Sequence, residues 1–335
     1  MIKTKAHLLL ENKREKGFLN CFENKITMSQ GVIVDDERIF KILITGCNGY
    51  IGRLCYNALL NTKSFRMILT DRNVGFDANN RFGIEQVDNY NDYQIPESDV
   101  HIIDLVNEKD KLNELFEEYK PYVVIHLAGA LENSTLTAIN NNDIINENIL
   151  YCCNKYNSHC IVASSVMVYY GSCMIHPIIS NIFRRHDEIQ CPQSEQFNDD
   201  TKLLNNEYTI KLFTKENWEA TLAYILTKER LEILCRKIVS SNESITVIPV
   251  RFGWCSIKSV YDIEIQSLTD DSCTETSVIL HPKDLQQFIQ QLTQCIIDKT
   301  VQGFHIYNCI SNHKQRWIAL NHEEQQLRWM PQQLC

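Results

Sequence analysis

The sequence predicts an α/β fold, a doubly wound parallel sheet, and three observations support this. From residue 41 onward, short apolar runs of strand length alternate with segments that have helical periodicity. The runs are apolar throughout rather than alternating with polar residues, which is typical of strands covered on both faces. The first run also passes directly into a glycine-spaced turn and a helical pattern, as in a strand–turn–helix unit.

The elements follow one another in a regular order. The predicted strands are KILITG (41–46), RMILTD (66–71), VHIIDL (100–105), YVVIHLAG (122–129), CIVASSVMVY (160–169) and ITVIPVRFGW (245–254). The predicted helices between them cover 50–61, 108–120, 135–157 and 216–240. A polar stretch that is poor in glycine interrupts this rhythm before the last of these helices, so we expect an insertion at about 172–217.

Composition excludes several classes of function. The net charge of −9 argues against a nucleic-acid or anionic-membrane surface, because cations are not in excess. No apolar run approaches the ~20 residues of a membrane span, and the first apolar run is too short for a signal peptide. The 14 cysteines lie largely inside predicted elements and predict buried free thiols of a cytoplasmic protein. The histidines show no metal-ligand spacing with cysteines, so no metal site is expected.

The turn after the first strand has the pattern of a dinucleotide site. Gly46, Gly49 and Gly52 allow a tight turn, a close approach of the backbone to a pyrophosphate, and close packing of the helix on the strand. The helix that follows points its N-terminal amides at the phosphates. Asp71 ends the second strand, where a carboxylate can bind the adenosine ribose and repel a 2′-phosphate. NAD is therefore favoured over NADP, although the adjacent Arg72 weakens that preference.

A second group of residues is suited to acid–base chemistry. Tyr224 and Lys228 are four apart in a predicted helix and project from the same face. A phenol with its ordinary pKa of ~10 is a poor base at neutral pH, and a nearby ammonium favours the phenolate. Ser165 lies at the end of the fifth strand, where a parallel sheet presents its ligands, and its hydroxyl can bind the reacting oxygen. Ser164 is a rival that we expect to face the interior.

These motifs together resemble the extended short-chain dehydrogenase/reductases, of the NAD-dependent epimerase/dehydratase type. The matching pieces are ILITGCNGYIG, ILTD, IIDL, VVIHLAGA, NNDIINENIL, ASSVMVYYG, YILTK and VRFGW, in the family's order. The resemblance implies a Rossmann fold that binds NAD and a Ser165–Tyr224–Lys228 triad, with Lys228 also holding the nicotinamide ribose. The further cofactor residues that it implies are Asn48, Tyr50, Ile51, Asp104, Leu105, Leu127, Ala128 and Gly129, with Asn142 as a structural residue.

Within this family the chain is most similar to the uronate dehydrogenase and aldose 1-dehydrogenase branch, because the part after Lys228 is short and ends in a similar SxN…W segment. The resemblance implies that Glu132, Val166 and Arg251 contact the substrate. Arg251 would clamp a carboxylate or phosphate, and the alternative is an ion pair that holds the strand end. Uronate dehydrogenases carry Asn-His where this chain has Val166 and Met167, so polar sugar contacts are lost there, which argues against uronate itself and leaves sugar phosphates and neutral sugars open.

The expected organisation has three parts: an extension over 1–38, an NAD-binding domain over 39–254, and a small substrate-binding part over 255–335. The function that follows is an NAD-dependent oxidoreductase that transfers hydride from a sugar-like hydroxyl to NAD, with Tyr224 as base. The alternatives are a sugar epimerase that retains its NAD and a regulator that binds NAD without turnover. Helix 216–240 is apolar on most sides, and the corresponding helix of the family forms a dimer interface, so we expect a homodimer.

Overall fold

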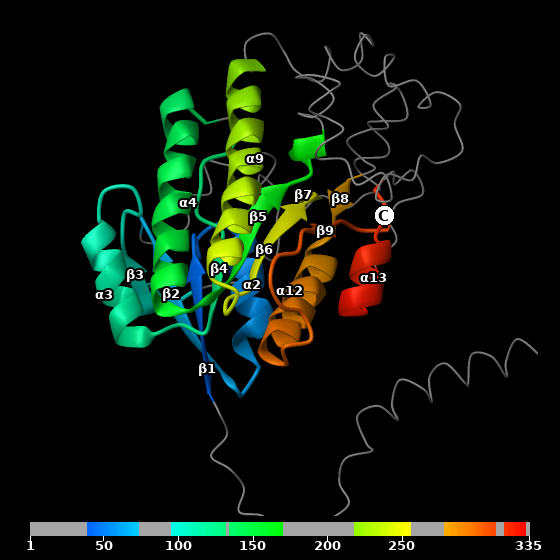
Figure 1. Cartoon of the computed structure of the whole chain (residues 1–335), viewed down its shortest axis with the longest axis horizontal. Coiled ribbons are helices and arrows are strands. Elements are labelled where there is room, and N and C mark those ends of the chain that lie inside the picture. The colour runs from blue at the N-terminus through cyan, green and yellow to red at the C-terminus, as the bar shows by residue number, and fades with distance from the viewer. Residues whose placement is uncertain are drawn as a thin grey trace, which may run out of the picture. The chain divides into compact units, whose positions relative to one another are not determined.

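The computed structural model describes residues 39–73, 95–131, 134–169, 218–255, 278–312 and 318–332. Three predicted features lie outside these ranges: the extension 1–38, the insertion at about 172–217, and Glu132. The segment 39–335 forms one compact unit, and its described parts are drawn in colour in Figure 1.

The centre of this unit is a seven-stranded sheet in the order β3-β2-β1-β4-β5-β6-β9, and every neighbouring pair is parallel. Its strands are β1 (Phe40–Thr45), β2 (Phe65–Asp71), β3 (Val100–Ile102), β4 (Val123–His126), β5 (His159–Ser165), β6 (Val247–Phe252) and β9 (Tyr307–Cys309). The chain crosses from β3 to β4, on the other side of β1, so the topological switch point lies between β1 and β4. Ligands of such sheets bind outside the carboxyl ends of the strands at this point.

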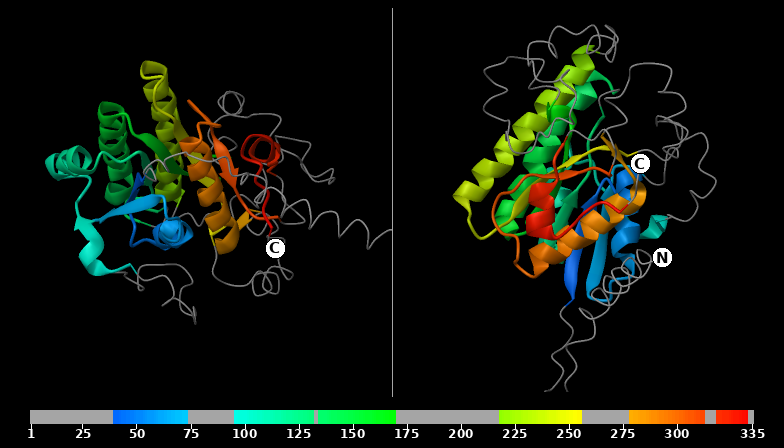
Figure 2. Two further views of the ribbon diagram at one scale, coloured as in Figure 1. Left: turned by 90° about the horizontal axis from the view of Figure 1, so that it is seen from below. Right: turned by 90° about the vertical axis from the view of Figure 1, so that its right-hand side faces the viewer.

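Helices cover both faces of the sheet, as the apolar strands predict (Figure 2). Ile42 and Ile44 of β1 pack in one core cluster, and Leu43 between them packs in the other, because successive side chains of a strand point to opposite faces. The first face is covered by α2 (Tyr50–Leu60) and α12 (Pro282–Ile297), and the second by α3 (Lys109–Tyr119), α4 (Leu136–Tyr156) and α9 (Trp218–Ser241).

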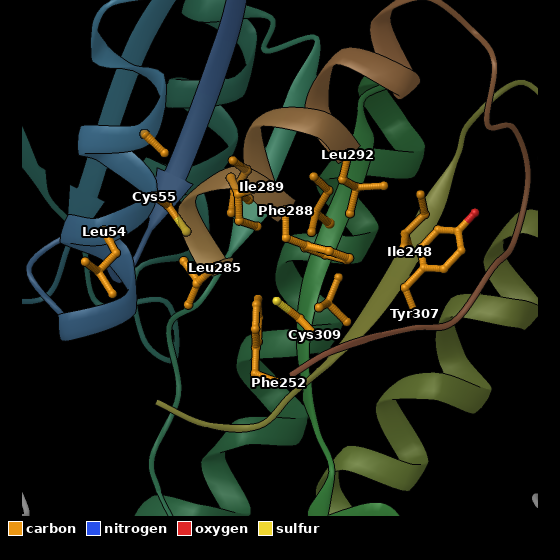
Figure 3. Close-up of a cluster of buried hydrophobic side chains, with 14 of the residues drawn as sticks. Leu54, Cys55, Ile248, Phe252, Leu285, Phe288, Ile289, Leu292, Tyr307 and Cys309 are labelled. Carbon is orange, nitrogen blue, oxygen red and sulfur yellow. The ribbon is translucent and has the colours of Figure 1, made fainter. Parts of the chain in front are cut away.

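The C-terminal segment contributes to the main sheet and its core. β9 extends the sheet beyond β6, and Phe288 and Leu292 of α12 pack with Leu54 of α2 in the first cluster (Figure 3). Each such fully buried side chain contributes about 1.5–3 kcal/mol to folding. A further helix, α13 (Asn321–Leu327), contacts α12, and the short strands β7 (Trp254–Cys255) and β8 (Ile279–Leu280) pair with each other. The substrate-binding role of residues 255–335 stays a prediction.

The observed elements agree with the predicted ones except at their ends. The fifth strand ends at Ser165 rather than continuing to residue 169: the amide of Val166 still binds the carbonyl of Phe252 on β6, and the chain then turns, with the amide of Tyr169 bonded back to the carbonyl of Val166. The nine cysteines within the described ranges are free thiols, and all but Cys255 are buried. No described helix combines the length and the apolar character that a membrane span requires.

Candidate functional site

The turn between β1 and α2 needs glycine at two positions. Gly46 has a φ of +68°, and a Cβ added to it would lie 2.7 Å from the amide nitrogen of Ala128. A Cβ on Gly52 would lie 2.2 Å from the carbonyl oxygen of Gly46, so α2 packs directly on the turn. Gly49 is the N-cap of α2, so this helix begins with Tyr50 and Ile51 directly after the turn. The positive end of the helix dipole therefore lies at the carboxyl end of β1, where an anionic ligand is accommodated.

Asp71 lies at the end of β2 and binds this glycine turn. Its Oδ2 accepts a hydrogen bond from the backbone amide of Asn48 at 3.0 Å, and its Oδ1 accepts one from the amide of Arg72 at 2.7 Å. The Asn48 side chain in turn donates to the carbonyl of Asn73 at 2.7 Å. The predicted ribose-binding carboxylate is therefore already oriented against the turn, and the Arg72 side chain is exposed beside it.

The loop after β3 is held by Asp104, a predicted cofactor residue. Hydrogen bonds from the Val106 amide and the Asn107 side chain, at 2.9 and 2.8 Å, lower the pKa of this carboxyl. The carbonyl of the adjacent Leu105 accepts a hydrogen bond from Asn148 of α4 at 2.9 Å. These contacts place Asp104 and Leu105 at the carboxyl edge of the sheet, beside the end of β2.

The loop after β4 is held from α4. The Asn142 side chain accepts a hydrogen bond from the Ala130 amide at 2.7 Å and donates one to the Ala130 carbonyl at 3.0 Å. It thus satisfies both backbone groups of Ala130, as a neighbouring strand would. A Cβ on Gly129 would lie 3.2 Å from Asn142 Oδ1. Leu127 and Ala128 donate their amides to Thr45 Oγ1 at 3.3 and 3.4 Å. The structural role that the resemblance implies for Asn142 matches these contacts.

His126 lies beneath this loop in a buried chain of hydrogen bonds. Its Nδ1 is 2.7 Å from Thr45 Oγ1, and its Nε2 is 3.1 Å from Asn146 Oδ1. Burial lowers the pKa of His126 to about 3, because its effect, together with that of the positive charge of Lys228, outweighs the opposing effect of the hydrogen bond to Asn146. The imidazole is therefore neutral at physiological pH, which agrees with its interpretation from the sequence as a core histidine.

This neutral imidazole makes the stability of the fold dependent on pH. Below pH 6.5 the unfolded chain binds a proton on His126 that the folded protein does not bind until about pH 3. The free energy of unfolding should therefore fall by about 1.4 kcal/mol per pH unit as the pH drops through this window. Urea unfolding of wild type and His126→Gln between pH 7 and pH 4 measures this slope. Equal slopes for the two proteins would exclude His126 as the source.

The three predicted catalytic residues come from β5 and α9. Ser165 ends β5, and its Oγ accepts a hydrogen bond from the Met167 amide at 3.2 Å, so its hydroxyl hydrogen is left to donate. Tyr224 and Lys228 are buried on α9, and Lys228 Nζ lies 5.3 Å from the centroid of the Tyr224 ring. Lys228 Nζ also donates to the carbonyl of Ala163 at 2.7 Å, two residues before Ser165 on β5. Through Lys228, the helix that carries Tyr224 and Lys228 is thus attached to the strand that carries Ser165.

Two of the predicted substrate residues are enclosed in the protein. Val166 is buried and packs in the first core cluster. Of the two alternatives for Arg251, the structure shows the ion pair: its guanidinium is buried and makes two hydrogen bonds to Glu232, at 2.9 and 2.7 Å. Burial alone would lower the pKa of Arg251, but the charge of Glu232 outweighs this and raises it.

Glu232 is a residue of the candidate site that the sequence analysis missed. It also accepts a hydrogen bond from Ser164 at 2.6 Å, which confirms that the first serine of the pair faces the interior. The signal in the sequence was its spacing, because Tyr224, Lys228 and Glu232 recur every four residues on one face of α9.

The residues present fit NAD. Gly46 and Gly52 have no room for a Cβ, so the backbone itself forms a cradle at the carboxyl end of β1, and Asp71 lies at the end of the neighbouring strand. Within the described ranges no group of three or more histidine, cysteine or acidic side chains is arranged to hold a metal ion.

Comparison with solved structures shows the same fold in several enzymes. Glucuronic acid dehydrogenase from Chromohalobacter salexigens is 15% identical with a TM-score of 0.54, covering 88% of this chain and 85% of that one. A mutant of uronate dehydrogenase from Agrobacterium tumefaciens complexed with NAD is 15% identical with a TM-score of 0.53, covering 88% and 86%. ADP-L-glycero-D-manno-heptose-6-epimerase from Helicobacter pylori is 14% identical with a TM-score of 0.53, covering 90% and 94%.

No curated protein matches the sequence. A family model does match residues 42–252, which run from β1 through β6 and include the glycine turn, the serine strand and the Tyr224–Lys228 helix. The members of this family are NAD-dependent. The chain therefore belongs to the NAD-dependent epimerase/dehydratase family.

Proposed function

We propose that this protein is an NAD-dependent oxidoreductase that oxidises a sugar-like hydroxyl, such as C1 of an aldose, uronate or sugar phosphate. The observation that supports it best is the attachment of Lys228 to β5: the Nζ that lies by the Tyr224 ring binds Ala163, two residues before Ser165. This contact attaches α9, which carries Tyr224 and Lys228, to the strand that ends in Ser165.

Each residue then has a separate task. Tyr224 removes the proton from the substrate hydroxyl, and the nearby ammonium of Lys228 favours the phenolate that this requires. Ser165 donates its hydroxyl to the same substrate oxygen, because its own oxygen already accepts from Met167. NAD, when bound, would supply the acceptor for the hydride of the substrate carbon. With an aldose, oxidation at C1 gives a lactone.

The cofactor residues are assigned by their positions. The backbone around Gly46, Gly49 and Gly52 would hold the pyrophosphate, and Asp71 the adenosine ribose. Asp104 and Leu105 would lie toward the adenine, and Leu127, Ala128 and Gly129 along the rest of the cofactor, with Lys228 at the nicotinamide ribose.

The experiment that tests the function is a substrate panel with purified full-length protein. Aldoses, uronates and sugar phosphates are each incubated with NAD, and NADH is followed by absorbance. NADH formation with at least one sugar supports the proposal. Tightly retained cofactor with an epimerised sugar and no net NADH would support the epimerase instead, and neither product with any sugar would contradict both.

Asp71 should set the preference between NAD and NADP. Replacing it by alanine removes a charge-assisted acceptor for the ribose and the repulsion of a 2′-phosphate, so NAD should bind about 10–100-fold more weakly while NADP loses less. Calorimetric titration of both cofactors measures the ratio of the two Kd values. Asp71→Asn is the matched control, since it keeps an acceptor for the Asn48 amide. An unchanged ratio in Asp71→Ala would contradict the assignment.

We also infer a homodimer formed through α4 and α9. These helices pack side by side, and each leaves apolar side chains open to solvent: Ile144 and Tyr151 on α4, and Ile233 on α9. Light scattering should give about twice the 39.0 kDa mass of one chain, and Ile233→Glu should shift the mass toward one chain because it places a charge in the interface. A single-chain mass for wild type would refute the dimer.

A further inference from the structure

A buried ion pair lies directly beneath the proposed triad. Arg251 of β6 and Glu232 of α9 have side chains that are only 4% exposed, and both carboxylate oxygens are bound by the guanidinium. Buried pairs of this kind add little stability compared with apolar residues of similar volume, because both charges must leave water. Their directional hydrogen bonds do, however, specify one arrangement of the two elements that carry them.

Ser164 extends this pair to the strand that carries the proposed catalytic serine. Its hydroxyl donates to Glu232 at 2.6 Å, and its backbone is in register with Arg251 on the neighbouring strand. Ser165, the next residue, is in register with Phe252. The network therefore joins α9, β5 and β6 at the residue immediately before the end of β5.

Two side chains one turn apart on α9 bind consecutive residues of β5. Lys228 binds the carbonyl of Ala163, and Glu232 binds the hydroxyl of Ser164. A rotation of α9 by one residue, about 100°, or a translation of about 1.5 Å would break both contacts. Tyr224 lies one turn before Lys228 on the same helix, so its position relative to β5 depends on the same register.

The far side of the pair is also held. The Arg251 guanidinium lies 4.6 Å from the centroid of the Tyr169 ring, and the Tyr169 hydroxyl donates to Asn308 Oδ1 at 3.0 Å. Asn308 belongs to β9 and is in register with Arg251. The Arg251 guanidinium is thus held by contacts with Tyr169 and by the position of its strand next to β9, independently of Glu232. Because its position is fixed in this way, it can fix the position of Glu232 and therefore of α9.

From these contacts we propose that Glu232, Arg251 and Ser164 are positioning residues, which set the register of α9 against β5 and thereby hold Tyr224 and Lys228 opposite Ser165. The kinetic consequence rests on the function proposed above, whereas the structural consequence does not. Apolar packing alone has no direction and allows α9 to slide or rotate by small amounts on the sheet.

The test compares wild type with the double variant Glu232→Leu/Arg251→Met, which replaces both charges by apolar side chains. The thermal midpoint of unfolding should stay near that of wild type, because no charge is left buried without a partner. The kcat should nevertheless fall by about 10–100-fold, since small displacements of catalytic groups have effects of this size, while KM and the Kd for NAD change less. Crystal structures of the two proteins should show that the Lys228–Ala163 contact is lost in the variant.

Arg230→Met is the matched control. It removes another ion pair from α9, between Arg230 and Asp143 at 2.7 Å, but this pair is solvent-exposed and joins α9 to α4 instead of β5. Its kcat should stay close to that of wild type. Should the double variant fail to fold, Ser164→Ala takes its place: kcat should fall by about threefold or more with KM retained, and Ser164→Thr, which keeps the hydroxyl, should restore it.

Two outcomes would overturn the proposal. In the first, the double variant keeps the Lys228–Ala163 contact in its crystal structure, which shows that the register does not depend on the pair. In the second, the double variant keeps both the thermal midpoint and the kcat of wild type, which shows that the ion pair does not position the catalytic residues. If wild type makes no NADH with any sugar, the proposed function fails, and the crystal structures still decide the role of the network.

Discussion

Replacing Tyr224 by phenylalanine is expected to lower kcat by about 10²–10⁴-fold, the range that a general base contributes. The substitution removes only the hydroxyl, so the ring stays next to Lys228 and the fold of α9 is preserved. The Kd for NAD should remain close to that of wild type, because the glycine turn and Asp71 are untouched. Steady-state kinetics on the sugar identified in the panel, together with calorimetric titration of NAD, measure both quantities.

The matched control for this variant is Tyr122→Phe. Tyr122 precedes β4 and therefore lies at the opposite edge of the sheet, where its ring packs against Phe40 and His159. This variant should retain the kcat of wild type. Comparable activity of Tyr224→Phe and wild type would remove Tyr224 as the base and with it the reaction proposed here.

The second large effect is expected on the free energy of unfolding, when only one partner of the buried Arg251–Glu232 ion pair is replaced. Arg251→Met should lower the free energy of unfolding by about 3–5 kcal/mol, because the carboxylate of Glu232 is then left in the core without its counter-charge. Glu232→Gln should act in the same direction, since it leaves the guanidinium buried without a carboxylate. Urea unfolding followed by circular dichroism gives both values.

Arg230→Met again serves as the reference. Its ion pair with Asp143 is exposed, and loss of an exposed pair lowers the free energy of unfolding by about 0–1 kcal/mol. A loss for Arg251→Met no larger than that for Arg230→Met would show that the buried pair is not coupled to folding. Such a result would also weaken its proposed role in setting the register of α9.

The sequence by itself determined the fold and the cofactor. Strand and helix periodicities are local properties, and they placed α2, α3, α4 and α9 within one or two residues of their observed ends. The turn at Gly46 and Gly52 was also recognisable, because the positive φ of Gly46 and the close approach of Gly52 to the carbonyl of Gly46 are local to the turn. The spacing of Tyr224 and Lys228 predicted their shared face, since four residues span about one helical turn.

Only the tertiary structure decided which partners the buried polar groups take. The sequence left Arg251 with two alternatives, and the choice of Glu232 depends on how α9 lies across β5 and β6. In the same way, the apolar run does not show where the fifth strand ends, and its pairing with β6 ends at Phe252, more than eighty residues further along the chain. Contacts of this kind arise where elements distant in sequence meet. Periodicity within one element cannot specify them, because it encodes which face is buried but not what packs against it.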